Sequence, residues 1–281
     1  MKDKVCIVAI AKDELKFIDE WVVYHRLLGI DHIFLYDDED GTPLFQYFEQ
    51  SSFVTVVKWH YCRDQNTNLR NQILAYWHAI RNNVKDFEWV AFIDIDEFLV
   101  IRDIDNIKVF LKRFPFAGSI SLNWHVFGHS GFFDDPDGLI TANLTRRMYQ
   151  PSVNVKTIVR TSLIVEIMPD YCTLRNGKRV DANNRAFSVD LYPGRTEQAH
   201  INHYQCRSFT RWMKRAERGD VNFNYENAPE EQQWRLSVES CLRKFVTTVA
   251  FDKNEFEDTY MKKFEERLLY ELNNRQKLKK S

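Results

Sequence analysis

The sequence predicts an α/β protein built around a mainly parallel central sheet. In the first hundred residues, short apolar segments alternate with segments whose apolar residues recur at helical spacing. This alternation is typical of β–α–β units, in which right-handed crossovers connect parallel strands. The 281 residues fit one large domain, alone or with a helical extension.

We expect four strands and two long helices in this first part. The first helix is indicated by apolar residues from Ile18 to Leu28, with Gly29 as its C-cap. The second is indicated by apolar residues spaced three and four apart from Leu69 to Val84. The strands are predicted at 5–11, 33–36, 54–59 and 90–93.

The second part is less regular. Long loops are expected at 128–138 and 170–200, and a helical pattern runs from Ser208 to the end of the chain. Strands are expected at 119–127, 156–167 and 200–204. We therefore divide the chain into 1–100, 101–207 and a helical C-terminal extension, 208–281.

Composition narrows the function classes. Acidic and basic residues nearly balance, at a formal net charge of -1, which gives no bulk electrostatic reason to expect a nucleic-acid partner. No signal peptide and no apolar run that approaches a membrane span is visible, so we expect a cytoplasmic protein. The five cysteines form no close CxxC pair and are expected to be reduced.

The most informative motif is acidic and follows the apolar run of the fourth strand. Asp94 and Asp96 stand two residues apart, so in extended geometry they share a face. Two hard oxygen ligands suit Mg²⁺ or Mn²⁺, with phosphate oxygens and water completing the shell. The alternative is a strand end whose carboxylates pair with nearby arginine or lysine. For Glu97 we favour that structural pairing.

Two other predicted strands also end in polar residues. Lys12, Asp13 and Glu14 follow the first, and Asp37 and Asp38 follow the second. Since ligands of open α/β sheets bind beyond the carboxyl ends of the strands, these residues should converge with the acidic motif on one crevice.

These segments together resemble the nucleotide-sugar-dependent glycosyltransferases of the GT-A fold, in the group of families 2 and 92. The likeness covers about residues 5–219. The segments that carry it are Trp89–Phe98, Asn123–Gly131, Ile201–Tyr204 and the basic run from Arg207 to Gly219.

The resemblance implies a Rossmann-like sheet flanked by helices and a metal-dependent transfer. It implies that Asp94 and Asp96 meet a Mn²⁺ or Mg²⁺ ion that bridges the donor diphosphate, with His203 completing the metal shell. It also implies that residues 1–100 bind the nucleotide-sugar donor and that 101–207 carry the acceptor side. The residues expected at the donor are Ala11, Asp13, Glu14, Asp37, Arg70, Asn71, Asp94 and Lys156.

Inverting transfer needs a general base for the acceptor hydroxyl. Asp134 and Asp135 are our candidates, although Asp-Asp-Pro-Asp-Gly is also ordinary turn sequence. Lys156, Arg160 or Lys214 could help to neutralise the leaving diphosphate beside the metal. The aromatic residues Trp124, Phe132 and Phe133 are candidate acceptor contacts.

We therefore expect a hexosyltransferase-like enzyme with a UDP-sugar donor. Its acceptor would be a glycan or lipid-linked glycan in surface polysaccharide biosynthesis. One alternative is a sugar-nucleotide nucleotidyltransferase, which the lack of glycine in Val8–Asp13 disfavours. Another is a catalytically silent glycan-binding protein with the same fold.

The C-terminal end leaves two interpretations open. Apolar residues recur every four positions from Phe256 to Leu272, which predicts a helix with one apolar face. Basic residues gather around and after this helix. They form either a solvated basic tail or a peripheral contact with the inner face of an anionic membrane.

Overall fold

The computed structural model describes residues 3–59, 71–187, 195–218, 238–250 and 252–280. The chain divides into two compact units. The first comprises residues 1–124 and 151–202, and the second comprises 125–150 and 203–281. Our boundaries at 100 and 207 divide the chain by expected role, and that division stays a prediction.

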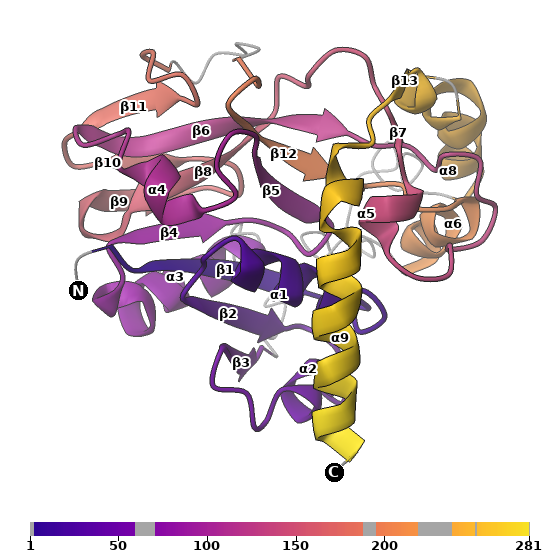
Figure 1. The fold of residues 1–281 in the computed structure, drawn as a ribbon, viewed down its shortest axis with the longest axis horizontal. Coiled ribbons are helices and arrows are strands. Elements are labelled where there is room, and N and C mark those ends of the chain that lie inside the picture. The colour runs from indigo at the N-terminus through magenta and orange to yellow at the C-terminus, as the bar shows by residue number, and fades with distance from the viewer. Residues whose placement is uncertain (1–2, 60–70, 188–194, 219–237, 251, 281) are drawn as a thin grey trace. The chain divides into compact units, whose positions relative to one another are not determined.

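The first unit contains the predicted parallel strands. β3 (Val54–Lys58), β2 (His32–Asp37), β1 (Val5–Ala11) and β4 (Trp89–Phe92) lie side by side in that order, all parallel (Figure 1). All four coincide with strands expected from apolar runs. Parallel strands are buried on both faces, which is why their sequences read as continuous apolar segments.

Beyond β4 the sheet becomes mixed. β8 (Val155–Arg160) is antiparallel to β4, and β6 (Ala117–Val126) is antiparallel to β8. The order then continues through β12 (Ala199–His203) and β5 (Glu97–Ile101), while β11 (Lys178–Asp181) pairs in parallel with β6. The predicted α/β class is confirmed.

The two longest described helices of the first unit pack on this sheet. α3 (Asn71–Asn82) joins the core that contains Cys6, Val8 and Ile10, the alternate residues of β1. α1 (Ile18–Leu27) is fastened to β5, because the Trp21 indole donates to the Glu97 carbonyl at 2.7 Å. After α1 the chain turns at Gly29, where φ is +94° and the N–H of Ile30 donates to the His25 carbonyl. Shorter helices of the first unit include α2 (Pro43–Tyr47), α4 (Ile107–Leu111) and the 3₁₀ turn η1 (Val84–Asp86).

One expected strand is in fact two. The 156–167 segment consists of β8, a 3₁₀ turn (η2, Thr161–Leu163) and β9 (Ile164–Ile167). Arg160 ends β8 through a bond from its Nε to the Ala117 carbonyl and an ion pair with Glu88. The 170–200 segment is also less irregular than expected, since β10 (Cys172–Leu174) pairs with β9 and β11 joins the main sheet. These strands are only three and four residues long, and their pairing partners define them rather than their own sequence.

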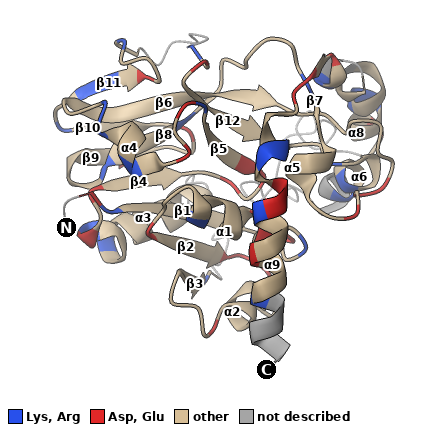
Figure 2. Cartoon of the chain, in the orientation of Figure 1, with Lys and Arg blue, Asp and Glu red and all other residues tan. Residues whose placement is uncertain are grey.

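Apart from a 3₁₀ turn at Tyr260–Phe264, the second unit contains six described helices and helical turns. They are α5 (Ile140–Asn143), α6 (Phe209–Arg218), α8 (Val238–Lys244), the π-helical turn η4 (Phe245–Val249), the 3₁₀ turn η5 (Asp252–Asn254) and α9 (Glu265–Lys280). Acidic and basic residues both occur along the described part of α9 (Figure 2). No helix among the described residues has the length and apolar character that a membrane span requires.

The predicted helix from Phe256 begins nine residues later, at Glu265. Phe256 and Glu257 instead form β13, which pairs with β7 (Arg146–Arg147), and Tyr260–Phe264 is a 3₁₀ turn (η6). The Phe256 ring lies 4.5 Å from the Arg147 guanidinium carbon, so this contact and the strand pairing override the helical spacing.

Candidate active site

The acidic motif lies where β4 meets the beginning of β8. The two strands are antiparallel, and Phe92 at the end of β4 is paired with Thr157 near the start of β8. This register brings Lys156 next to Asp94, although the two are 62 residues apart in the chain. Lys156 of β8 therefore lies beside the carboxyl end of β4.

The Lys156 ammonium is surrounded by carboxylates. Its Nζ lies 2.9 Å from Asp94 Oδ2, 3.4 Å from Asp170 Oδ1 and 3.7 Å from Glu97 Oε2. The side chain is only 2% exposed. Burial alone would lower the pKa of Lys156, but the nearby Asp94 and Glu97 carboxylates raise it well above its ordinary value, so the lysine stays charged.

Asp94 is held on both sides but remains partly open to solvent. Its Oδ1 accepts a bond from Gln72 Nε2 at 2.8 Å, its Oδ2 meets Lys156, and its side chain is 32% exposed. Its own N–H donates to Glu97 Oε2 at 2.8 Å. Since each carboxylate oxygen can accept more than one bond, Asp94 retains capacity for a ligand on its solvent side.

Glu97 has the structural place that its sequence context predicted. Its side chain is fully buried, and it both faces Lys156 and accepts the Asp94 N–H. Burial, followed by the charges of Asp94 and Asp96, raises its pKa well above that of an ordinary glutamate, against the effect of Lys156. Glu97 therefore holds the backbone of Asp94 in place.

The donor set fits a metal ion that arrives with phosphate oxygens. Within the described part of the chain, no three histidine, cysteine, aspartate or glutamate side chains are grouped to hold an ion by themselves. Mg²⁺ sites of nucleotide enzymes commonly use one or two carboxylates, with substrate phosphates and water supplying the remaining ligands. Asp94 and the half-buried Asp96 are of this kind. Metal binding stays a prediction.

At the end of β2, the consecutive aspartates Asp37 and Asp38 have different environments. Asp37 is fully buried, and its Oδ2 accepts the Phe45 N–H of α2 at 3.0 Å. Burial raises its pKa. Asp38 instead accepts a bond from Asn71 Nδ2 at 2.9 Å, and Asn71 Oδ1 accepts one from the Trp59 indole at 2.8 Å. Asp38, Asn71 and Trp59 thus form one polar chain across the ends of β2, β3 and α3.

Of the remaining residues predicted at the donor, Ala11 is bonded to the polar chain of Asp38, Asn71 and Trp59. The Ala11 carbonyl accepts the Asp38 N–H at 2.9 Å. Asp13 has a φ of +58°, and its N–H donates to Glu39 Oε2 at 3.0 Å. The Glu14 carbonyl accepts the N–H of Ile18 at the start of α1. Arg70 lies outside the described residues, and donor contact by any of these residues stays a prediction.

The second unit contains the predicted base candidates and His203. Asp135 Oδ1 accepts a bond from Ser208 Oγ at 2.7 Å, just before α6, whereas Asp134 is exposed. Phe133 is 64% exposed and lies against the Phe209 ring, with 4.9 Å between centroids. The His203 side chain is buried, and its carbonyl accepts the Phe127 N–H. The catalytic and metal roles of these residues stay predictions.

Two residues in these clusters, Trp59 and Asp170, were not among the candidates from the sequence. Trp59 ends the third predicted strand without any polar signal, and Asp170 stands in a segment expected to be an irregular loop. Asp38 was named from the sequence, but its separation from Asp37 was not. Consecutive residues of a strand point to opposite faces, and this alternation was the one indication that the two aspartates have different environments. By this alternation, Asp37 and Asp38, at the end of β2, are expected to point to opposite faces.

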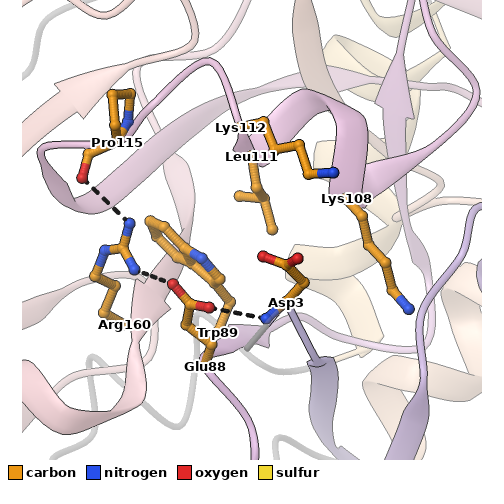
Figure 3. A pocket seen from close by; sticks show the side chains of 8 residues that line it. All are labelled: Asp3, Glu88, Trp89, Lys108, Leu111, Lys112, Pro115 and Arg160. Atoms are coloured by element: carbon orange, nitrogen blue, oxygen red, sulfur yellow. Dashed lines mark hydrogen bonds and ion pairs between the residues drawn. The ribbon is translucent and has the colours of Figure 1, made fainter. Parts of the chain in front are cut away.

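A separate cavity of about 260 Å³ lies at the opposite ends of β1 and β4. Figure 3 shows Arg160 joined to Glu88 over Trp89, with Lys108 and Lys112 on the α4 side. Because Trp89 begins β4 and Asp94 follows its end, this cavity is not part of the acidic site.

Comparison with known proteins places these features in a family. The sequence model of glycosyltransferase family 92 matches residues 4–243. A family 92 protein of Oryza sativa subsp. japonica is 28% identical over 163 residues, which are 56% of this chain and 26% of that protein. A family 92 protein of Ricinus communis is 26% identical over 198 residues, 67% of this chain and 35% of that protein. The chain thus spans about a quarter to a third of the length of these curated relatives.

Solved structures show only a distant likeness. HddC from Yersinia pseudotuberculosis is 13% identical with a TM-score of 0.35, over 71% of this chain and 92% of that one. Glucosyl-3-phosphoglycerate synthase from Mycobacterium tuberculosis, in complex with phosphoglyceric acid, is 12% identical with a TM-score of 0.32, over 57% and 58%. At these scores the likeness supports no inference about the site.

Proposed function

This chain belongs to glycosyltransferase family 92, and we propose that it transfers a sugar from a nucleotide-diphospho-sugar, with UDP as the carrier, to a glycan or lipid-linked glycan. The observation that carries the proposal is the position of Asp94. Its partly exposed carboxylate follows the carboxyl end of β4, where a parallel sheet binds ligands, and Lys156 holds it in place.

The polar chain of Asp38, Asn71 and Trp59 supports a nucleoside position at the ends of β2 and β3. Its carboxylate and amide groups suit a ribose or a base edge, and Trp59 offers an aromatic surface. Within the aspartate pair, Asp38 is better placed for this contact than the buried Asp37. Asp37 would act indirectly, by fixing the start of α2.

A divalent ion, Mn²⁺ or Mg²⁺, would be held by Asp94 and Asp96 and would neutralise charge on the leaving diphosphate. We keep His203 as a candidate ligand and Asp134 as the more exposed candidate base. In inverting transfer the base takes the proton of the acceptor hydroxyl while that oxygen bonds to the anomeric carbon. As this bond forms, the bond between the anomeric carbon and the diphosphate oxygen breaks, and the nucleoside diphosphate leaves with its electron pair.

Membership of the family favours transfer over the nucleotidyltransferase alternative. The intact carboxylate site favours an active enzyme over a silent glycan-binding protein. We also propose a cytoplasmic location and a role in surface polysaccharide synthesis.

Calorimetry with UDP, with and without Mn²⁺, tests the proposal. We expect UDP to bind more tightly with Mn²⁺, and Asp96→Asn to abolish this metal dependence while the apo protein keeps its melting temperature. Asp103→Asn, at an exposed ion pair with Arg113, is the control. Slow Mn²⁺-dependent hydrolysis of a UDP-sugar would separate an enzyme from a silent binder. Equal UDP affinity with and without metal in both proteins would refute the metal-dependent transferase.

A further inference from the structure

We infer that Asp170 is a sugar-contacting residue of the donor site and that Lys156 is the residue that positions it. This inference rests on the proposed function and extends it to the part of the donor that is transferred. The observation behind it is that Lys156 Nζ is shared between Asp94 Oδ2, at 2.9 Å, and Asp170 Oδ1, at 3.4 Å. The same ammonium therefore fixes two carboxylates from distant parts of the chain.

The loop that carries Asp170 is fastened to the start of β8 at several points. The Pro169 carbonyl accepts a bond from Lys156 Nζ at 3.4 Å, and the Asp170 carbonyl accepts one from Thr157 Oγ1 at 2.9 Å. The loop is closed on itself by the Met168 N–H, which donates to the Tyr171 carbonyl. Asp170 thus has a defined backbone position at this edge of the site.

The two partly exposed carboxylates differ from the two buried members of the cluster. The Asp170 side chain is 45% exposed and that of Asp94 is 32% exposed, whereas Lys156 and Glu97 are 2% and 0% exposed. The buried Lys156 and Glu97 therefore hold the two aspartates in place. Asp94 and Asp170, which are partly exposed, are available to a ligand. A carboxylate held in this way accepts hydrogen bonds from sugar hydroxyls without having to be ordered on binding.

The order of the strands indicates which part of the donor meets Asp170. The sheet runs β3-β2-β1-β4-β8, with the Asp38–Asn71–Trp59 chain at β2 and β3, Asp94 after β4, and Lys156 on β8. A nucleotide sugar is linear, with the diphosphate between the nucleoside and the sugar. If the nucleoside lies over β2 and β3 and the diphosphate meets Asp94, the sugar extends past β4 towards β8. Asp170 is the partly exposed acid fixed there.

The test compares UDP alone with UDP-glucose, UDP-galactose and UDP-N-acetylglucosamine, in the presence of Mn²⁺, for the parent chain and Asp170→Asn. Because a hydrogen bond to a charged group is involved, we expect the affinity for the preferred UDP-sugar to fall about ten- to a hundredfold. The affinity for UDP should not change. Glu166→Gln, an exposed acid on the adjacent β9, should alter neither affinity.

The outcomes separate this inference from the proposed function. Loss of UDP-sugar affinity with unchanged UDP affinity supports the role of Asp170. Equal effects on UDP and on the UDP-sugars, or no effect on either, overturn it while leaving the transferase intact. A parent chain that binds neither UDP nor any UDP-sugar would overturn both.

Discussion

Lys156 and Asp94 form an ion pair of 2.9 Å in which the lysine is buried and the aspartate is partly exposed. The asymmetry matters because the buried partner cannot be hydrated if the pair is broken, whereas the exposed partner can. Glu97, also buried, has its carboxylate on the same ammonium. Lys156 therefore neutralises both the partly exposed Asp94 and the buried Glu97. From the sequence alone, Lys156 was only a candidate for direct contact with the donor.

Replacing Lys156 with methionine should destabilise the fold and disorder the acidic site together. Removing one partner of a buried ion pair typically costs about 3–5 kcal/mol, because the other charge is left buried. We expect a loss of this size in urea unfolding, and weaker Mn²⁺-dependent UDP binding under conditions where the variant is folded.

The same substitution at Lys108 is the control. Lys108 pairs with Asp31 at 2.6 Å, but both side chains are partly exposed, so the loss should be about 1 kcal/mol or less. Equal losses at the two lysines would contradict the central role of Lys156.

A second prediction concerns Gly128, which is closely covered by the C-terminal segment. A Cβ at this position would lie 2.5 Å from the Lys253 carbonyl oxygen and 2.6 Å from the Asn254 side chain. Asn254 also accepts the Ser130 N–H through Oδ1, at 2.8 Å. Gly128→Ala should therefore cost about 1–3 kcal/mol of stability and make the 252–258 segment more sensitive to protease.

Gly131→Ala is the matched comparison. Gly131 has a φ of +87° and nothing within 4 Å of its would-be Cβ, so its substitution carries only a backbone cost of about 1–2 kcal/mol. Cleavage in 252–258 that increases equally in both variants would show that the contact with Gly128 does not hold this segment.

The C-terminal end provides a third prediction. Leu268 anchors α9 through a fully buried side chain, so deletion of residues 275–281 should leave the fold intact. If the basic end contacts an anionic membrane, each basic residue near the surface contributes about 1 kcal/mol at low salt. We expect flotation with phosphatidylserine vesicles to fall on deletion and with added salt. Equally weak flotation of the full-length and shortened chains, as with neutral vesicles, would identify a solvated tail.

Comparison of sequence and structure shows where local pattern is sufficient. The apolar runs of β1 and β4 specify buried parallel strands, and the acids after β4 follow directly from the end of that run. Lys156 acquires its role only through the pairing of Phe92 with Thr157, a register between distant segments that no local pattern encodes.

The errors have the same origin. Phe256 has a helical neighbour pattern, but its contact with Arg147 and the pairing of β13 with β7 make it extended. Asp170 has no periodic neighbours at all, and only the closing of its loop onto β8 brings it to Lys156. Long-range pairing of short segments is thus what the sequence could not predict here.

The final prediction concerns the pH dependence of stability. His25 is fully buried, its Nδ1 lies 2.8 Å from the Trp21 carbonyl oxygen, and its Nε2 accepts the Leu99 N–H at 3.3 Å. This arrangement requires the neutral ring with its proton on Nδ1. Burial, partly opposed by the bond to Trp21, lowers the pKa of His25 to about 3.

Since an unfolded histidine titrates near pH 6.5, the unfolded chain binds one more proton than the folded chain between about pH 6.5 and 3. The contribution of His25 is therefore fully present above pH 6.5 and is lost as the pH falls, by about 1.4 kcal/mol per unit. We expect the difference in unfolding free energy between the parent chain and His25→Gln to shrink by about 2 kcal/mol from pH 7.5 to 5. Urea unfolding across this range measures it, and a difference independent of pH would mean that His25 is not held in its neutral form.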